Sequence, residues 1–253
     1  MKKITFLLMG LTGSLLFGQA TFDHEVYEEN GRFLPYRILL PNDFQANKKY
    51  PLLVFLHGAG ERGEDNELQL IHGSALFLNG AFREKHPAIV VFPQCPQDAY
   101  WATVLSREGP QRFAFSEKPK ENPQLDLVEG MLRMLQKKYR INKKQLYVGG
   151  LSMGAMGTFE LVYRNPRKFA AAFAICGGAN PKIAKKLRRP VWRIDHGEAD
   201  EVVPIQLSEN MVAALKEKKA KVQFYRYAGV NHNSWDNVFA DPAFLPWLFS
   251  QSK

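Results

Sequence analysis

The most constraining stretch of this chain is Gly150-Leu151-Ser152-Met153-Gly154, a serine with a glycine two positions away on either side. A short apolar run, residues 146–148, precedes it, and a helix-like segment, residues 155–163, follows. Strand, sharp turn and helix are the context in which this pattern exposes a serine at the tip of a sheet. Glycines leave room for a turn in which a larger residue would clash. The pattern alone also fits an ordinary strand-to-helix turn, and the flanking segments favour Ser152 as a nucleophile.

Short apolar runs alternate with helix-like segments along the chain. The runs are 52–56, 88–92, 146–148, 170–176, 191–194 and 222–227, and the helix-like segments include 124–139, 206–218 and 235–250, the last as one or two pieces broken near Asp241-Pro242. This alternation predicts an α/β fold with a mostly parallel sheet and helices on both faces. Asn30-Gly31 between two β-like runs predicts an N-terminal antiparallel hairpin.

Three of these runs end in residue types that suit nucleophilic catalysis. Ser152 follows the run 146–148, Asp200 follows 191–194, and His232 follows 222–227. The carboxyl ends of parallel strands lie at one edge of a sheet, so we expect the three side chains to meet there. His232 would take the proton of the Ser152 hydroxyl, and Asp200 would fix the tautomer of His232. Ser152, Asp200 and His232 are therefore the predicted catalytic residues.

Each of these assignments has an alternative. Asp200 also fits a turn-capping aspartate, and His232 also fits a structural histidine, although Asn-His-Asn after a strand is typical of an exposed turn. Asp195 is a rival acid, but its place in the strand is too early to reach His232. His57 and His196 stand at strand ends before glycines, and we interpret them as structural supports.

The stretch Leu56-His57-Gly58-Ala59-Gly60-Glu61-Arg62-Gly63, the motif at 150–154, the segment 196–204 and His232 occur in this order over nearly the whole chain. With them the chain resembles α/β-hydrolases. Within that superfamily it is similar to secreted bacterial esterases of the dienelactone-hydrolase, phospholipase/carboxylesterase and polyester-depolymerase type, a group that includes predicted peptidases. The resemblance implies the α/β-hydrolase fold and a Ser-Asp-His triad.

The oxyanion of an acyl-transfer intermediate needs two backbone donors. One is expected from Met153, directly after the nucleophile. The resemblance points to Ala59 for the other, with Gly58 as the alternative.

The substrate pocket is expected to be open. Hydrolases of this fold often carry a cap between the fourth and fifth apolar runs, but residues 179–190 leave room for one short helix, so we expect no large cap domain. The long irregular segment 94–123 is a candidate pocket wall. It contains Tyr100, Trp101, Phe113 and Phe115. Trp101 and, beyond the segment, Trp235 are the predicted substrate-binding residues; the alternative for the aromatic residues of 94–123 is that they cover the sheet edge.

Residues 1–20 have the composition of a signal peptide. Lys2-Lys3 is followed by an apolar run and by small residues at Gly18 and Ala20. We therefore expect cleavage near Ala20, a secreted or periplasmic protein, and one catalytic domain over residues 21–253. The alternatives are an N-terminal anchor or a buried helix, but the apolar run is too short for a stable membrane anchor.

Charge and cysteine content limit the partners. Losing the two lysines of the leader lowers the formal net charge from +9 to +7, and the remaining positive residues are spread over helix-like segments, so a nucleic-acid partner is not expected. No metal or nucleotide motif is present, so we expect no metal and no cofactor. The sheet order that the resemblance implies puts Cys95 and Cys176 about three strands apart, too far for a disulfide, so we expect two free, buried thiols.

Together these features predict a serine hydrolase of carboxylic esters that works through an acyl-enzyme on Ser152. By resemblance, feruloyl or acetyl groups on polysaccharide are a natural substrate class. The alternatives are a serine peptidase with the same triad, an acyltransferase, and a non-catalytic binding protein on a hydrolase scaffold. The sequence does not indicate an oligomeric state.

Overall fold

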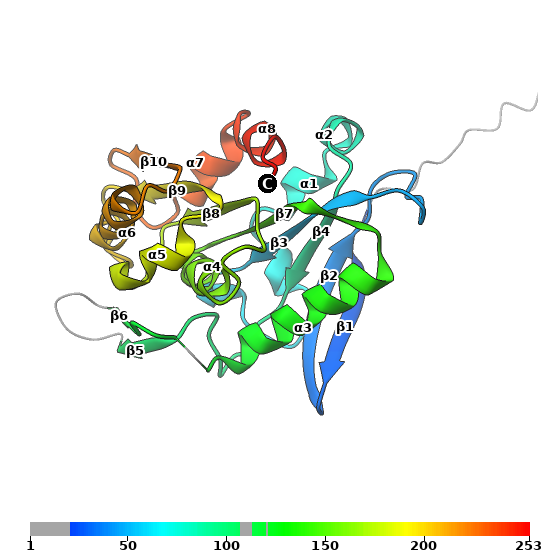
Figure 1. The fold of residues 1–253 in the computed structure, drawn as a ribbon, viewed down its shortest axis with the longest axis horizontal. Coiled ribbons are helices and arrows are strands. Elements are labelled where there is room, and N and C mark those ends of the chain that lie inside the picture. The colour runs from blue at the N-terminus through cyan, green and yellow to red at the C-terminus, as the bar shows by residue number, and fades with distance from the viewer. Residues whose placement is uncertain (1–20, 107–112, 120) are drawn as a thin grey trace, which may run out of the picture.

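A central sheet organises the computed structural model, which describes residues 21–106, 113–119 and 121–253. Within these residues the sheet has eight strands in the order β1-β2-β4-β3-β7-β8-β9-β10 (Figure 1). The strands are β1 (Asp23–Glu29), β2 (Arg32–Leu39), β3 (Tyr50–Leu56), β4 (Ile89–Pro93), β7 (Ile141–Leu151), β8 (Ala171–Ile175), β9 (Val191–Gly197) and β10 (Val222–Tyr227). β4, β3 and β7 to β10 pair in parallel, which confirms the predicted mostly parallel sheet.

The first two strands form the predicted antiparallel hairpin. Asn30 and Gly31 at its tip have φ values of 54° and 72°, the left-handed conformation that a tight two-residue hairpin turn requires. β2 then pairs antiparallel with β4 and joins the hairpin to the parallel strands.

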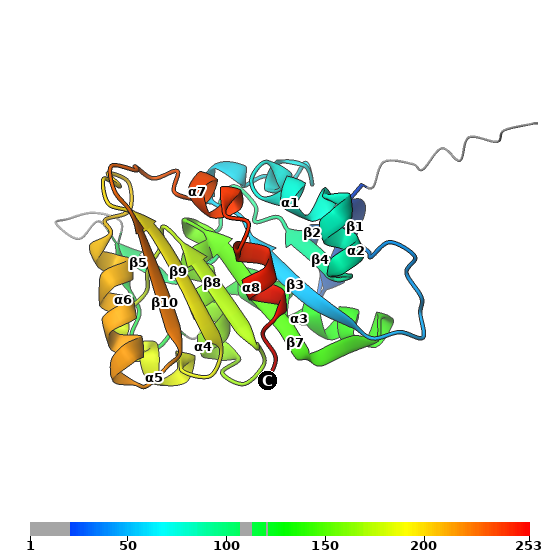
Figure 2. The same ribbon diagram turned by 90° about the horizontal axis from the view of Figure 1, so that it is seen from above.

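Helices cover both faces of the sheet, as Figures 1 and 2 show. One layer contains α3 (Pro123–Lys138), α4 (Met153–Arg164), α5 (Ala184–Leu187) and α6 (Gln206–Glu217), and the other contains α1 (Ser74–Leu78), α2 (Gly80–Lys85), α7 (Trp235–Ala240) and α8 (Phe244–Phe249). Residues of β3 alternate between the two cores: Val54 and Leu56 pack under α3 and α4, whereas Leu53 and Phe55 pack under α1 and α8. The strand is therefore apolar throughout because both of its faces are covered.

Local signals explain where the helices begin and end. α3 begins after Asn122, whose side chain accepts hydrogen bonds from the N–H groups of Gln124 and Leu125, and Pro123 occupies its first turn. The chain between α7 and α8 breaks at Asp241-Pro242, so the C-terminal region forms two helices. The short 3-10 helices are η1 (Ala59–Glu61), η2 (Leu68–Leu70) and η3 (Pro181–Ile183).

The connections at the carboxyl ends of the parallel strands leave this end of the sheet without a cap. Between β8 and β9 the chain forms only η3 and α5, so the structure has no large cap there. The segment 94–123 contains the small hairpin β5 (Val104–Ser106) and β6 (Ala114–Phe115), while residues 107–112 and 120 lie outside the described residues. The predicted signal peptide, residues 1–20, also lies outside them. Among the helices of the described chain, none has the length and apolarity to cross a membrane.

Both cysteines are free and buried, as predicted. Cys95 follows β4 and Cys176 follows β8, and β3 and β7 lie between these two strands in the sheet. A disulfide would need Cα atoms within about 7 Å, less than the width of the intervening strands.

Candidate active site

Ser152 occupies the turn between β7 and α4. Its backbone has φ 51° and ψ −116°, outside the regions that residues with a side chain usually adopt. A Cβ atom on Gly150 would lie 2.3 Å from the carbonyl oxygen of Leu56, and one on Gly154 would lie 1.9 Å from it. Both flanking positions therefore need glycine, because the end of β3 packs directly against the turn.

The structure brings the three predicted catalytic side chains together. His232 Nε2 lies 2.9 Å from Ser152 Oγ, and His232 Nδ1 lies 2.8 Å from Asp200 Oδ2. The second oxygen of Asp200 accepts hydrogen bonds from the N–H groups of Val202 and Val203, at 2.9 and 2.8 Å. Asp200 is therefore both the acid that faces His232 and a turn-capping aspartate, two interpretations that the sequence presents as alternatives.

The hydrogen bonds fix the proton positions along this chain of residues. Burial alone would raise the pKa of Asp200, but hydrogen bonds from His196, His232 and the Val203 N–H hold that pKa well below its usual range. The ionised carboxylate only accepts, so Nδ1 of His232 carries the hydrogen. In a neutral ring Nε2 then has a free lone pair that faces the hydroxyl of Ser152. This geometry suits proton transfer from serine to histidine.

His196 supports Asp200 from within the core. Its side chain is fully buried, and its Nε2 lies 2.8 Å from the Val203 carbonyl oxygen and 3.1 Å from Asp200 Oδ2. Both of these atoms only accept, so Nε2 carries a hydrogen and donates to them. Nδ1 lies 2.7 Å from the hydroxyl of Ser208, which fixes the ring. The predicted structural role of His196 thus includes a second hydrogen bond to Asp200.

Asp195 belongs to a separate ion-pair cluster. Arg193 donates three hydrogen bonds to its carboxylate, at 3.0 to 3.2 Å, and the Tyr227 hydroxyl donates another at 2.8 Å. Arg193 also bonds Asp241 at 2.8 Å. The partners of Asp195 are therefore structural, and Asp200 is the acid that faces His232.

Ala59 and Met153, the predicted oxyanion donors, each begin a helical segment. The first N–H groups of a helix have no intrahelical partner. In the described part of the chain, the N–H groups of Ala59 and Met153 donate no other backbone hydrogen bond either. A Cβ on Gly58 would lie 3.7 Å from Ser152 Cβ, so the loop that carries Ala59 adjoins the nucleophile.

His57 holds this loop in place. Its Nε2 accepts a hydrogen bond from the N–H of Cys95 at 2.9 Å. In the neutral ring Nδ1 therefore carries the hydrogen, and it donates to the Gly58 carbonyl oxygen at 2.6 Å. The C=O and N–H of a trans peptide point in opposite directions, so this bond turns the Ala59 N–H away from His57. Burial lowers the pKa of His57 to about 4, which keeps the ring neutral at pH 7. The predicted supporting role of His57 fits these contacts.

Trp101 does not line the site, which corrects the sequence-based prediction. Its side chain is fully buried. The ring packs edge-on against His57 at a centroid distance of 5.4 Å, and a Cβ on Gly157 would lie 2.4 Å from Trp101 Cβ. Trp101 therefore fills the space between α4 and the loop of His57. The sequence could not separate this role from a pocket wall, because both use a large aromatic residue.

Other aromatic residues remain partly exposed. Trp235 stands edge-on to His232, with ring centroids 5.4 Å apart, so a substrate contact for Trp235 remains a prediction. A small apolar cluster lies over the start of α4 and α6. It contains Tyr100, Ala102, Val104, Phe113, Phe115, Met156, Val203 and Leu207.

Two polar contacts that the sequence analysis missed join the loops around the site. Glu160 of α4 is buried. Its carboxylate accepts hydrogen bonds from the N–H of Thr103 at 2.6 Å and from the Thr103 hydroxyl at 2.9 Å. Asn231 Oδ1 accepts the N–H of Glu201 at 3.1 Å and that of His232 at 2.7 Å. No sequence pattern signals the first contact, because its partners are 57 residues apart.

Cys176, Asp200 and His232 have donor atoms within 4.8 Å of one another. Burial raises the pKa of the Cys176 thiol, so the thiol keeps its proton, and a metal ligand would have to lose it. Asp200 and His232 already bond each other. This set is therefore poorly suited to a resident metal ion.

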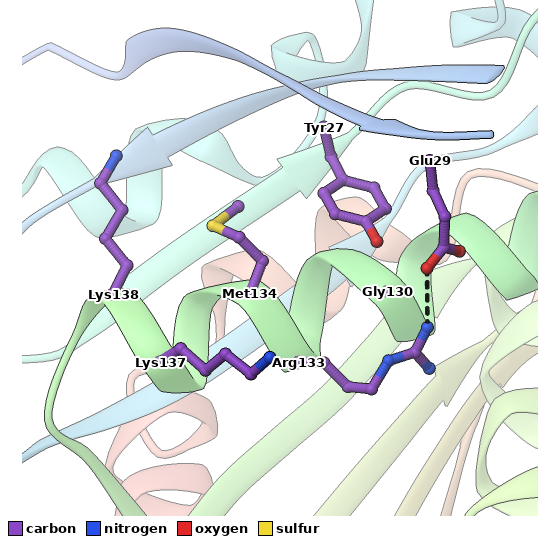
Figure 3. A pocket seen from close by; sticks show the side chains of 7 residues that line it. All are labelled: Tyr27, Glu29, Gly130, Arg133, Met134, Lys137 and Lys138. Atoms are coloured by element: carbon purple, nitrogen blue, oxygen red, sulfur yellow. Dashed lines mark hydrogen bonds and ion pairs between the residues drawn. The ribbon is translucent and has the colours of Figure 1, made fainter. Parts of the chain in front are cut away.

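A separate hollow of about 560 Å³ lies between β1 and α3. Figure 3 shows Tyr27 and Glu29 of β1 facing α3, with Arg133 bonded to Glu29. The remaining lining residues are Gly130, Met134, Lys137 and Lys138. Ser152, Asp200 and His232 are not among the lining residues, so this hollow is not part of the candidate active site.

Solved structures share this architecture. A crystal structure of a thermostable esterase aligns with a TM-score of 0.83 and 34% sequence identity, covering 92% of this chain. The present chain spans 63% of that esterase. A ferulic acid esterase of Anaeromyces mucronatus aligns with a TM-score of 0.67 and 18% identity over 95% of this chain and 93% of its own.

Sequence comparisons agree with the structural ones. Lysophospholipase-like protein 1 of Mus musculus is 26% identical over 195 residues, 71% of this chain and 79% of its own. A bifunctional acetylxylan esterase/xylanase of Neocallimastix patriciarum is 34% identical over 92 residues, 36% of this chain and 14% of its own. The model of the phospholipase/carboxylesterase family matches residues 44–243. The chain therefore belongs to the phospholipase/carboxylesterase family of α/β-hydrolases and is a carboxylic-ester hydrolase.

Proposed function

We propose that this ester hydrolase uses Ser152 as nucleophile, His232 as general base and acid, and Asp200 as the group that orients His232. The observation that carries the proposal is the pair of hydrogen bonds of 2.9 and 2.8 Å on the two nitrogens of His232. A serine hydroxyl reacts slowly until a base accepts its proton, and this geometry provides that base.

The reaction proceeds in two halves. His232 Nε2 takes the proton of Ser152 as Oγ forms a bond to the ester carbonyl carbon, whose oxygen becomes an oxyanion. The N–H groups of Ala59 and Met153 stabilise that charge, and the N-terminus of α4 adds its dipole. His232 then gives the proton to the leaving alcohol oxygen as the carbon–oxygen bond breaks. Water, activated by His232, repeats the sequence on the acyl-enzyme and releases the acid.

For the natural substrate we favour acetyl or feruloyl esters of plant polysaccharide. Support comes from the names of an acetylxylan esterase among the sequence relatives and of a ferulic acid esterase among the structural neighbours. The short connection between β8 and β9, which leaves the site uncapped, is compatible with a polymeric substrate. The leader-like composition of residues 1–20 supports export from the cell, where such a polymer is found.

The nucleophile is tested with 4-nitrophenyl acetate and butyrate, with peptide anilides assayed in parallel. Ser152→Ala should lower kcat by about 10³-fold or more, while Ser250→Ala, an exposed serine at the end of α8, should match the wild type. A fluorophosphonate should add its mass to the peptide that contains residue 152. Ester turnover that survives Ser152→Ala, or faster cleavage of anilides than of esters, would contradict the proposal. N-terminal sequencing of protein from the culture medium or periplasm tests export, with a start near Thr21 expected.

A further inference from the structure

Glu61 places a carboxylate beside the nucleophile without a full set of hydrogen-bond partners. Its side chain is 11% exposed, and its Oε2 is buried with no hydrogen-bond partner among the described residues. A Cβ on Gly58 would lie 2.9 Å from this oxygen and 3.7 Å from Ser152 Cβ. A buried acceptor without a donor costs free energy. Because Oε2 itself is closed to solvent, a ligand hydroxyl would meet the Glu61 carboxylate at the 11% of the side chain that is exposed.

His72 and Trp235 extend this position toward the triad. His72 Nε2 lies 3.7 Å from Glu61 Oε1, longer than a hydrogen bond, and its side chain is 31% exposed. The His72 ring packs at 5.0 Å from the ring of Trp235, and Trp235 stands 5.4 Å from the ring of His232. Glu61, His72 and Trp235 thus form a continuous row of neighbouring side chains, here called the wall, that reaches His232.

The chemistry of ester cleavage determines which part of a substrate meets this wall. His232 must come within hydrogen-bond reach of the leaving oxygen to protonate it. The alcohol part of the ester therefore lies on the side of His232, where Trp235 stands, and the acyl part lies elsewhere on the site.

We infer that Glu61, His72 and Trp235 form a subsite for a hydroxyl-bearing alcohol group, a sugar residue of the ester. This inference rests on the proposed role of Ser152 and His232. A sugar hydroxyl donates a charge-assisted hydrogen bond to Glu61, and the apolar face of the sugar ring packs on Trp235. The same carboxylate disfavours an anionic alcohol such as a glycerophosphate, because like charges repel at close range.

The test compares two acetate esters that differ only in the alcohol, ethyl acetate and methyl mono-O-acetyl-xyloside, each followed by acid release. The measured quantity is the ratio of kcat/KM for the sugar ester to kcat/KM for ethyl acetate. Glu61→Leu should lower this ratio by about 10- to 100-fold, the loss expected for a hydrogen bond to a charged group. Glu64→Leu, an exposed acid on the same loop, is the matched control and should keep the wild-type ratio.

The outcomes separate the subsite from the chemistry. If the ratio is unchanged in Glu61→Leu, whether kcat/KM stays the same on both esters or falls equally on both, the subsite is overturned. The nucleophile assignment then still stands. Wild-type protein that cleaves neither ester nor 4-nitrophenyl acetate overturns the proposed function itself. If Glu61→Leu does not fold, His72→Leu gives the same comparison, and an unchanged ratio there also overturns the subsite.

Discussion

Ser152 has an unusual backbone conformation that its neighbours hold in place. Its N–H donates to the Ile175 carbonyl of β8 at 2.8 Å, and its carbonyl accepts the N–H of Met156 at 3.1 Å. A positive φ at a residue with a side chain is maintained only where the surrounding structure over-determines it. Here the sheet and the helix hold the backbone of Ser152, and its hydroxyl lies 2.9 Å from His232 Nε2.

A proline at position 59 would remove the Ala59 N–H, and the backbone around it is compatible with that change. Ala59 is the first residue of η1, where proline is tolerated, and Gly58 before it is extended, with φ −77° and ψ −179°, outside the α region that a following proline disfavours. Ala59→Pro should therefore lower kcat by about 10²- to 10³-fold, because one oxyanion donor is lost. The measurement is steady-state hydrolysis of 4-nitrophenyl acetate, with circular dichroism as a check on folding.

Gly60→Ala is the control for that substitution. A Cβ at residue 60 meets no atom within 4 Å, so this variant should keep the wild-type rate. Full activity in Ala59→Pro would instead mean that the second donor comes from another residue of the loop.

Asp200 offers a test with a defined pH dependence. Its folded-state pKa lies below the unfolded value, so its ionised form contributes stability above about pH 4, and this contribution is lost as the pH falls through the folded-state pKa. Asp200→Asn should lower kcat by about 10⁴-fold, because an amide no longer favours the productive tautomer of His232. It should also lower the free energy of unfolding at pH 7 more than at pH 3. Urea titrations at the two pH values measure this, and an equal loss at both would refute the ionic role.

At the scale of elements, the critical packing is that of β3 against the turn before α4. A Cβ on Gly154 would lie 1.9 Å from the carbonyl oxygen of Leu56. This oxygen belongs to the backbone, so it cannot rotate away as a side chain could. Gly154→Ala should therefore lower the free energy of unfolding by at least about 3 kcal/mol, the upper part of the range for overpacked cores. Chemical denaturation measures the loss. A Gly154→Ala protein as stable as Gly60→Ala would show that β3 and the turn can separate without cost.

The elements that sequence reasoning predicted are those with a local cause. The Asn30-Gly31 turn and the break at Asp241-Pro242 each follow from the conformations that two adjacent residues allow. The irregular segment 94–123 has no such signal. Trp101 was misassigned there because its burial depends on α4, and the bond between Thr103 and Glu160 depends on how the whole segment folds over that helix.

At the scale of the whole molecule, the sheet determines which side chains meet. Ser152, Asp200 and His232 follow β7, β9 and β10, which lie on one side of the sheet in the order β7-β8-β9-β10 and run parallel. The sequence predicted this convergence because parallel strands end at one edge. It did not predict Glu61 and His72 near the same edge, since no local pattern relates a loop after β3 to residues of α7.

His57 links the stability of the whole fold to pH. Its folded-state pKa is about 4, against about 6.5 in the unfolded chain, because the buried ring disfavours a charge. The stability that comes from keeping it neutral is complete above pH 6.5 and is lost as the pH falls toward 4, a loss of about 3 kcal/mol. His57→Gln removes this contribution. The free energy of unfolding of the variant should therefore be lower than that of the wild type at pH 7.5, but it should fall less than that of the wild type between pH 7.5 and pH 4. Urea titrations of both proteins at these pH values measure the difference. Equal falls in the two proteins would show that the ring of His57 takes up a proton in the folded state as readily as in the unfolded one.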